Sequence, residues 1–436
     1  MMAVILYLIF LIPLTFISVN WILMQLAILL ICLYVLMINF YSYFSTISYS
    51  FGLDMISYGL IILSFLISSL MIISMVFYTN MSLFVVINLF MMFLLFMIFS
   101  TLSFIYMYMY FEFVLIPLLV LIMGMGYQPE RLMAGMYLFF YTLFFSLPLF
   151  ILIMYMYNLK GSLFFDYLIN MNSSFFFIHL ILTVVFLVKL PMYLVHFWLP
   201  KAHVQAPVSG SMILAGLMLK IGGYGLIRTM YMYEYMYMHY SFIWYSFSLI
   251  GSLLISIVCL MQGDMKCLIA YSSISHMGLV ISGLMTMSLM GLWGSYFLMI
   301  GHGFCSSGLF YMANLFYART SSRMFFINKG LMTFIPSCCF FWFLLCSFNM
   351  SCPPSLNFVS EFMILSSIIN FWVWSIIMFV IISFFCACFS YYLYSFSQHG
   401  LYHNLYSFSS LSLLEFLCLF MHSMPLVLIP LFISVF

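Results

Sequence analysis

Apolar segments of about 20 residues, each long enough to cross a lipid bilayer, follow one another through almost the whole chain. The gaps between them are short, and only 4% of the 436 residues are charged while 68% are hydrophobic. Soluble domains carry about a quarter charged residues, far more than this chain could place on a water-facing surface. In lipid, every backbone polar group must be hydrogen-bonded internally, so such segments fold as helices. The sequence therefore predicts an all-α polytopic membrane protein.

We count about fourteen spans of this kind. They predict three N-terminal helices (1–80), a first repeat of helices four to eight (81–229), a second repeat of helices nine to thirteen (230–397) and a C-terminal helix (398–436). The approximate limits of the spans are 3–19, 21–40, 56–78, 82–104, 105–125, 133–157, 175–197, 208–229, 241–261, 267–288, 292–317, 331–370 with an interruption, 371–396 and 411–435.

Prolines interrupt two of the predicted spans. Pro191 and Pro200 fall in the seventh span, and Pro353 with Pro354 falls in the twelfth. Proline removes a backbone donor and clashes with the preceding turn, and non-helical backbone at membrane depth is tolerated only where protein or water satisfies it. Broken helices at corresponding positions of two repeats indicate the ion path of a transporter. Because the breaks lie five spans apart and five is odd, we expect two inverted five-helix repeats.

The distribution of basic residues favours one orientation, since lysine and arginine gather on the inner side of a membrane. Six of them follow odd-numbered spans and two follow even-numbered ones, which predicts that the N-terminus lies outside. No charged leader or small-residue cleavage site precedes the first span, so we expect no cleaved signal peptide. The six are Arg131, Lys201, Lys266, Arg319, Arg323 and Lys329, and the two are Lys160 and Arg228.

Two lysines lie inside apolar spans with almost no other charge nearby. Lys189 stands in LTVVFLVKLPMYLVHFWLP and Lys220 in SGSMILAGLMLKIGGYGLIR. An ammonium at bilayer depth costs roughly 2.5–3.5 kcal/mol on insertion scales, so it is kept where it meets a polar interior, a counter-ion or a proton acceptor. Glu112, in the fifth span, is the natural partner of Lys189. Changing that partnership would switch the lysine between its charged and neutral forms, as a proton carrier requires.

Further titratable groups accompany these lysines. His196 follows Lys189 by seven residues and would share its face on a continuous helix. His276 and His302 lie beside small and hydroxyl residues in YSSISHMG and LMIGHGFCSSGL, and Glu361 lies in LNFVSEFMIL. These groups favour a proton relay through bridging water. The alternative interpretation is structural, with a buried ion pair, a snorkelling lysine and helix-packing histidines.

Other classes of function find little support in the sequence. The eleven cysteines form no CxxC pair, which argues against a disulfide framework and against a zinc or iron–sulfur site. No GxGxxG motif follows a strand, and a net charge of +2 offers no basic patch for nucleic acid. We therefore expect no cofactor, metal or nucleic acid on this chain.

Four motifs resemble a known family, the antiporter-like proton-pumping subunits of respiratory complex I, and the similarity extends over essentially the whole chain. The resemblance implies fourteen helices with two inverted repeats. It also implies a non-redox, proton-translocating subunit of NADH:ubiquinone reductase in the mitochondrial inner membrane, with the N-terminus on the intermembrane-space side. The motifs are VKLPMYLVHFWLPKAHVQAPVSGSMILAGLMLKIGGYGLIR, GDMKCLIAYSSISHMG, GHGFCSSGLFYMANLFYAR and PPSLNFVSEF.

The resemblance also assigns individual residues. The family's glutamates of the fifth and twelfth spans fall on Glu112 and Glu361, and its lysines of the seventh and eighth spans fall on Lys189 and Lys220. One departure is Ser360, which stands where the family usually has glycine. The histidines of the family's polar central axis are matched by His276 and His302.

Partners follow from the same resemblance. Chains 2 and 5 of the complex would be neighbours, with a lateral helix of chain 5 along the side and lipid over the rest. NADH, flavin, iron–sulfur clusters and ubiquinone would be bound by other subunits. Two rival hypotheses stay open: a stand-alone multi-subunit cation/proton antiporter, which shares this fold, and a structural module whose charges serve only assembly.

Overall fold

The structure is a computed structural model that describes the chain except for residues 18–20, 39–43, 77–80, 170–174, 402–408 and 433–436. The domain limit predicted at residue 80 lies outside the described residues. The chain divides into two compact units. The first unit comprises Met1–Lys189, Gln205–Ile213 and Leu217–Tyr240, and the second comprises Leu190–Val204, Leu214–Gly216 and Ser241–Phe436.

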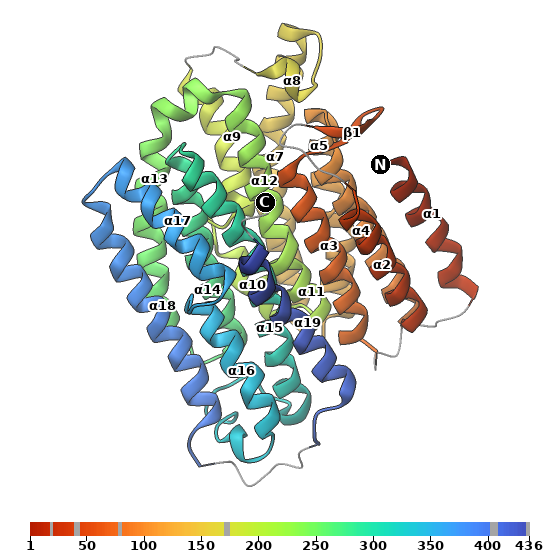
Figure 1. Ribbon diagram of the computed structural model, residues 1–436, viewed down its shortest axis with the longest axis vertical. Helices are drawn as coiled ribbons and strands as arrows, with labels where there is room; N and C mark the ends of the chain where they lie inside the picture. The colour runs from red at the N-terminus through yellow and green to blue at the C-terminus, as the bar shows by residue number, and fades with distance from the viewer. Residues whose placement is uncertain (18–20, 39–43, 77–80, 170–174, 402–408, 433–436) are drawn as a thin grey trace. The chain divides into compact units, whose positions relative to one another are not determined.

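The first unit is a helical bundle with one short pair of strands. Its elements are α1 (Met2–Ile17), α2 (Trp21–Leu36), β1 (Ser45–Ser48), β2 (Phe51–Leu53), α3 (Met55–Ser74), α4 (Met81–Ser100), α5 (Phe104–Phe113), α6 (Leu115–Leu119), η1 (Val120–Gly124), α7 (Arg131–Lys160), α8 (Phe165–Leu168), α9 (Phe176–Lys189), α11 (Val208–Ile213) and α12 (Leu219–Met232). α3 packs against both α2 and α4, and α9 packs against α7 and α12 (Figure 1).

The strands β1 and β2 connect α2 to α3. They pair antiparallel, with Ser45 opposite Leu53 and Ser48 opposite Phe51. Both strands lie in the gap between the second and third predicted spans, where hydroxyl side chains offer the backbone alternatives to a helix. α3 begins directly afterwards with a capping box, in which the carboxylate of Asp54 accepts from the N–H of Ser57 at 3.0 Å.

The second unit is built around one long helix. Its elements are α10 (Trp198–Gln205), α13 (Glu234–Leu260, whose first residues belong to the first unit), α14 (Met265–Met285), α15 (Leu289–Thr320), η3 (Leu331–Thr333), α16 (Pro336–Asn349), α17 (Leu356–Phe371), α18 (Ser375–Gln398) and α19 (Leu413–Phe432). α15 contacts α14, α16, α17 and α19, so its side chains face the interior of this unit for most of its length (Figure 1).

Helices end where the prolines interrupt the pattern. α9 ends at Lys189, one residue before the Leu190–Pro191 step, and the residue before a proline is pushed out of the helical region. α10 begins at Trp198 with Pro200 in its first turn, where a missing N–H is tolerated. In the second unit, α16 ends at Asn349, and α17 begins after Ser355, whose hydroxyl accepts from a backbone N–H.

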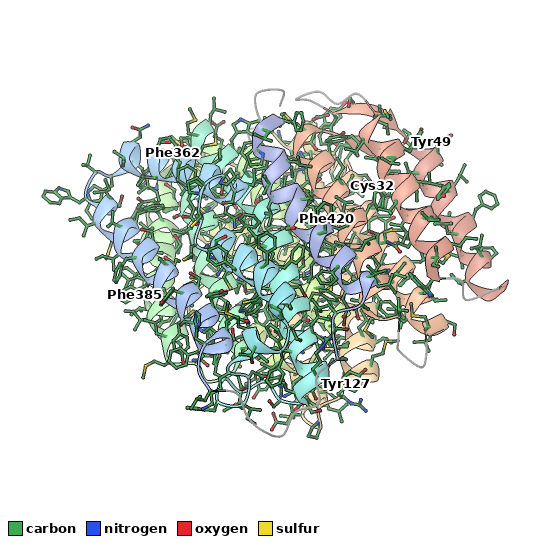
Figure 2. The ribbon with its side chains drawn as sticks, turned by 60° about the horizontal axis from the view of Figure 1, so that its bottom comes forward. Cys32, Tyr49, Tyr127, Phe362, Phe385 and Phe420 are labelled. Carbon is green, nitrogen blue, oxygen red and sulfur yellow. The ribbon has the colours of Figure 1, made fainter. Side chains whose placement is uncertain are left out.

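Among the described residues, nine helices are long and apolar enough to cross a membrane. Many large apolar side chains on these helices are exposed, including Phe420 on α19, which Figure 2 labels. Such a surface suits contact with lipid or with other apolar helices. The nine helices are Met55–Ser74, Met81–Ser100, Phe104–Gly124, Arg131–Lys160, Val208–Met232, Glu234–Leu260, Met265–Met285, Ser375–Gln398 and Leu413–Phe432.

Candidate proton-transfer site

Lys189 is buried at the C-terminal end of α9, with a side chain only 2% exposed. Its ammonium donates to the backbone carbonyl of Phe111 on α5 at 2.8 Å. It also stands 2.9 Å from the centroid of the Phe111 ring, a cation–π arrangement. The helix break after Lys189 therefore delivers a positive charge into the interior of the first unit, beside α5.

Glu112 lies next to this ammonium, as the sequence predicts, but the contact differs from the expected ion pair. The carboxylate interacts electrostatically with Lys189, Tyr108 and Ser146. Both of its oxygens are buried and accept no hydrogen bond of good geometry from the described residues. The lysine instead bonds to the carbonyl of the residue before Glu112. A carboxylate and an ammonium held close without a fixed bond can exchange partners, which a relay requires and a structural ion pair does not.

Lys220 is completely buried in α12 of the same unit. The helical segment that carries it has no exposed side chain within its most apolar stretch. α12 approaches α9 closely because Gly225 has no side chain, and a Cβ there would overlap the ring of Phe186. This close approach holds the helices of Lys189 and Lys220 together.

A second group of titratable side chains lies in the second unit. Nδ1 of His276 on α14 is 3.6 Å from a carboxylate oxygen of Glu361 on α17. The hydroxyl of Ser351, in the interruption before α17, donates to the same oxygen. The ring of His302 on α15 lies 5.6 Å from the ring of His276, measured between centroids. The structure thus brings together the three residues that the sequence selected from the second half of the chain.

His196 lies in the interruption between α9 and α10 and packs with the second unit. It does not share a helical face with Lys189, because the helix ends at that lysine. Its buried ring packs against Tyr193, Phe197 and Tyr271 at 5.7, 4.5 and 6.2 Å between centroids. The predicted shared face is therefore wrong, although the histidine does line the break.

One buried ion pair was not expected from the sequence. The position of Arg228 after an even-numbered span predicts a loop residue. In the structure it is buried in α12 and contacts the carboxylate of Asp54 at 2.8 Å. Tyr224, one turn earlier, accepts a further hydrogen bond from the guanidinium at 2.9 Å. Burial by itself would raise the pKa of Asp54, but Arg228 and the hydrogen bonds from Ser57 hold it below its ordinary value. The two residues are 174 positions apart in the sequence, so no local pattern predicts their contact.

His203 is a second residue that sequence reasoning missed. It lies on α10, is fully buried, and stacks on the ring of Phe310 of α15 at 4.5 Å with an interplanar angle of 4°. The available signal was its place in the longest of the family-like motifs, two residues after Lys201. The segment 231–240, an alternation of tyrosine and methionine, contains the end of α12 and the beginning of α13, with Tyr233 between them.

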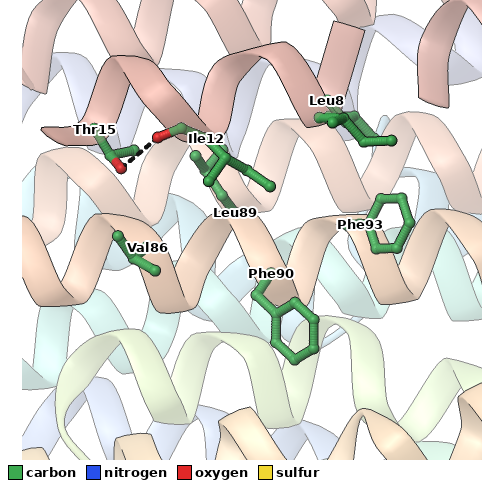
Figure 3. Close-up of a pocket in the computed structure, with 8 residues that line it drawn as sticks. Leu8, Ile12, Thr15, Val86, Leu89, Phe90 and Phe93 are labelled. Atoms are coloured by element: carbon green, nitrogen blue, oxygen red, sulfur yellow. Dashed lines mark hydrogen bonds between the residues drawn. The ribbon is translucent and has the colours of Figure 1, made fainter. Parts of the chain in front are cut away.

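The described part of the chain contains no group of three or more His, Cys, Asp or Glu side chains arranged to hold a metal ion. It does contain an apolar groove of about 230 Å³ between α1 and α4, lined by residues that include Leu8, Ile12 and Phe90 (Figure 3). Its one polar side chain, Thr15, donates to the carbonyl of Ile12 at 2.7 Å. The groove is lined by no titratable side chain. The candidate site therefore consists of the two groups of titratable side chains, one in each unit.

Known proteins resemble this chain over almost its whole length. A family model described as "NADH:quinone oxidoreductase/Mrp antiporter, TM" matches residues 101–390. A second, described as "NADH-ubiquinone oxidoreductase chain 4, amino terminus", matches residues 1–102. A solved structure, respiratory complex I from Thermus thermophilus with bound NADH, contains a chain that shares the fold, with a TM-score of 0.89 at 21% identity over 99% of this chain and 96% of that chain.

The fold and the matched transmembrane model define an antiporter-like membrane subunit. Relatives with the name NADH-ubiquinone oxidoreductase chain 4 are 49% identical in Ceratitis capitata, over 98% of this chain and 97% of the relative, and 50% identical in Aedes aegypti, over 94% and 93%. The chain belongs to the NADH-ubiquinone oxidoreductase chain 4 family.

Proposed function

We propose that this chain is a proton-translocating subunit in the membrane arm of respiratory NADH:ubiquinone oxidoreductase, a multi-pass protein of the mitochondrial inner membrane. The observation that carries the proposal is the burial of titratable groups inside apolar helices, where a charge is costly. Lys220 and His276 lie in helices of membrane length, and Lys189 lies in a shorter apolar helix. The names of the relatives support the same complex.

The first half of the proposed relay uses Glu112, Lys189 and Lys220. Movement of Glu112 towards or away from Lys189 would change which of the two holds the proton. The ammonium already has an alternative partner in the carbonyl of Phe111, so it can leave the carboxylate without losing every hydrogen-bond acceptor. A proton released from Lys189 would pass to Lys220 through water, and neither lysine would have to leave its helix.

The second half of the relay uses His276, His302 and Glu361, with His196 at the break between α9 and α10. A neutral imidazole accepts a proton on one nitrogen and donates from the other, so adjacent histidines pass protons without moving far. Glu361 would receive the proton from His276 across the 3.6 Å contact, and Ser351 would steady its carboxylate. We propose that the two groups are coupled, so that blocking either one stops pumping.

The wider organisation is also part of the proposal. It comprises fourteen spans, three N-terminal (1–80), two inverted five-helix repeats (81–229 and 230–397) and a last helix in 398–436, with the N-terminus on the intermembrane-space side. The helix interruptions after Lys189 and Asn349 support the repeats, since they fall at corresponding places.

The chain would act as a translocase component without redox chemistry of its own. NADH, flavin, iron–sulfur clusters and ubiquinone would be held by other subunits. Chains 2 and 5 of the complex, including a lateral helix of chain 5, would cover part of the exposed apolar surface, and lipid would cover the rest. No nucleic acid is expected to bind.

The proposal is tested by Glu112→Ala and Lys220→Ala in membranes that hold the assembled complex. Each change removes a relay group, so NADH-driven proton pumping and NADH–ubiquinone turnover are expected to fall on the order of a hundredfold while the complex still assembles. Lys160→Ala, at an exposed helix end, is the matched control and leaves both rates unchanged.

Two results would contradict the proposal. Full pumping by both relay variants would remove the relay assignment. Purification of the native protein without flavin and iron–sulfur subunits would favour the stand-alone cation/proton antiporter instead.

A further inference from the structure

Lys266 is a buried lysine that the relay described above does not use. It lies in the first turn of α14 and is only 6% exposed, although its position between two spans predicts a solvated loop residue. No carboxylate of the described residues forms an ion pair with it. The charged group that interacts with it most clearly is Arg323, which repels it.

The surroundings of Lys266 hold it in place from two sides. Its ammonium lies 5.9 Å from the ring centroid of Tyr317 on α15. The backbone beside it is fixed to the segment after α15. The N–H of Met265 donates to the carbonyl of Arg323 at 3.1 Å, and the backbones of Asp264 and Met324 form an isolated antiparallel β-bridge. The guanidinium of Arg323 is itself engaged, donating to the carbonyl of Val204 at 2.6 Å. The lysine is thus positioned by the fold without a fixed counter-ion.

Lys266 begins a line of polar side chains along one face of α14. Ser273 and His276 follow it by seven and ten residues, and on a helix of 3.6 residues per turn all three lie within about a quarter turn of one another. Ser273 is fully buried. Ten residues correspond to about 15 Å of helix, so the line reaches from the end of α14 to the histidine that contacts Glu361.

The facing side of α15 carries a matching line. His302, Ser306, Phe310 and Tyr317 share one face, and α15 runs antiparallel to α14, so Tyr317 meets Lys266 at one end while His302 meets His276 at the other. Ser306 is buried between them.

His203 enters the same line from α10, where it stacks on Phe310. The lines on α14 and α15 together form what we call the α14–α15 seam, lined by Lys266, Tyr317, His203, Ser273, Ser306, His276 and His302.

We propose that the α14–α15 seam is the proton entry route to the second unit, with Lys266 as the group that takes protons from the inner aqueous phase. This proposal rests on the proposed function and adds the route by which protons reach the second unit. Basic residues gather at this end of α14, which predicts that it lies on the inner side of the membrane. A buried lysine that forms no ion pair serves as a proton carrier and not only as a fixed charge.

Each transfer conserves the proton. The neutral amine of Lys266 gains one from water on the inner side. The resulting ammonium gives it to water beside Ser273, and His276 takes it on one imidazole nitrogen and releases one from the other towards Glu361. The hydroxyls of Ser273 and Ser306 each have free acceptor capacity, because they donate to backbone carbonyls of their own helices.

The test compares Lys266→Gln with Lys266→Arg in the assembled complex. Glutamine removes the titratable amine, and arginine keeps a positive charge that does not give up its proton. A relay role predicts that both variants lose NADH-driven proton pumping, on the order of tenfold or more. A structural role for the charge predicts that arginine restores pumping. Lys329→Gln, an exposed lysine of the neighbouring segment, is the matched control and is expected to pump normally.

A second variant keeps the test decisive if Lys266→Gln prevents assembly. The double change Ser273→Ala with Ser306→Ala removes the seam hydroxyls with little change in volume, and it is expected to slow pumping while the complex stays intact. Normal pumping by Lys266→Arg, or by the double variant, would overturn the seam. The variant Glu361→Gln is measured in parallel. Normal pumping by Glu361→Gln would contradict the proposed function itself. Loss of pumping in Glu361→Gln together with normal pumping in the seam variants would contradict only the entry route.

Discussion

At the scale of single residues, the buried charges differ in the groups that they contact. Arg228 touches a carboxylate directly and cannot release its proton, so its pair with Asp54 is a structural bond. Lys189 contacts a carbonyl and an aromatic ring, while the carboxylate of Glu112 stays beside it without a direct bond. The Asp54–Arg228 pair is therefore a fixed ion pair, whereas Lys189 and Glu112 have the arrangement that the proposed relay requires.

Replacing Asp54 by alanine is expected to destabilise the first unit by about 3–5 kcal/mol, because it leaves the guanidinium of Arg228 buried and unpaired. The double variant Asp54→Leu with Arg228→Met removes both charges and is expected to recover most of that loss. Thermal denaturation of the detergent-solubilised complex measures both. Equal stability of the single and double variants would mean that the pair is not coupled.

The pH dependence of this ion pair follows from the pKa of Asp54, which the folded state holds below its unfolded value near 3.8. A lowered pKa contributes stability above the unfolded value, and that contribution is lost as the pH falls towards the folded value. The stability difference between the native chain and Asp54→Asn is therefore expected to be constant near neutral pH and to shrink below about pH 4.

At the scale of elements, small residues and prolines decide where the charged helices lie. Proline ends α9 directly after Lys189, which frees that side chain to reach α5. Gly225 lets α12 approach α9 until the ring of Phe186 fills the space that a side chain would take. The distance between the helices of Lys189 and Lys220 thus depends on one absent methyl group.

Gly225→Ala is expected to cost about 1–3 kcal/mol by overpacking and to reduce proton pumping by moving α12 away from α9. A second change, Phe186→Val, makes room for the methyl group and is expected to restore part of both. Gly124→Ala is the control, since a Cβ there meets only Val120 at 4.0 Å. Pumping and thermal stability of Gly225→Ala equal to the control would show that the close approach is unimportant.

At the scale of the whole molecule, the titratable groups fall into two sets on different units. Glu112, Lys189 and Lys220 belong to the first unit, and His276 and Glu361 belong to the second. If a single proton path uses both sets, blocking either one stops the whole path. If the two sets served independent activities, a change in one set would leave the activity of the other unchanged.

The double variant Lys220→Ala with Glu361→Gln is therefore expected to pump no more slowly than the slower of its two single variants, since groups that act as a unit have non-additive effects. Proton pumping per NADH oxidised measures the effect in all three. Losses that multiply would indicate two independent activities and would contradict the coupling of the two groups.

The sequence alone determined the membrane class, the helical fold and the selection of buried titratable residues, because hydropathy and proline positions act locally along the chain. It also selected Glu112 as the partner of Lys189, and it selected His276, His302 and Glu361, which the structure places together.

Only the tertiary structure decided which group bonds to which. It paired Arg228 with Asp54 across 174 positions, gave Lys189 the carbonyl of Phe111, and buried Lys266 against Tyr317. A hydrogen bond or an ion pair depends on a few ångströms between helices that are distant in sequence, and no local pattern of residues specifies that distance.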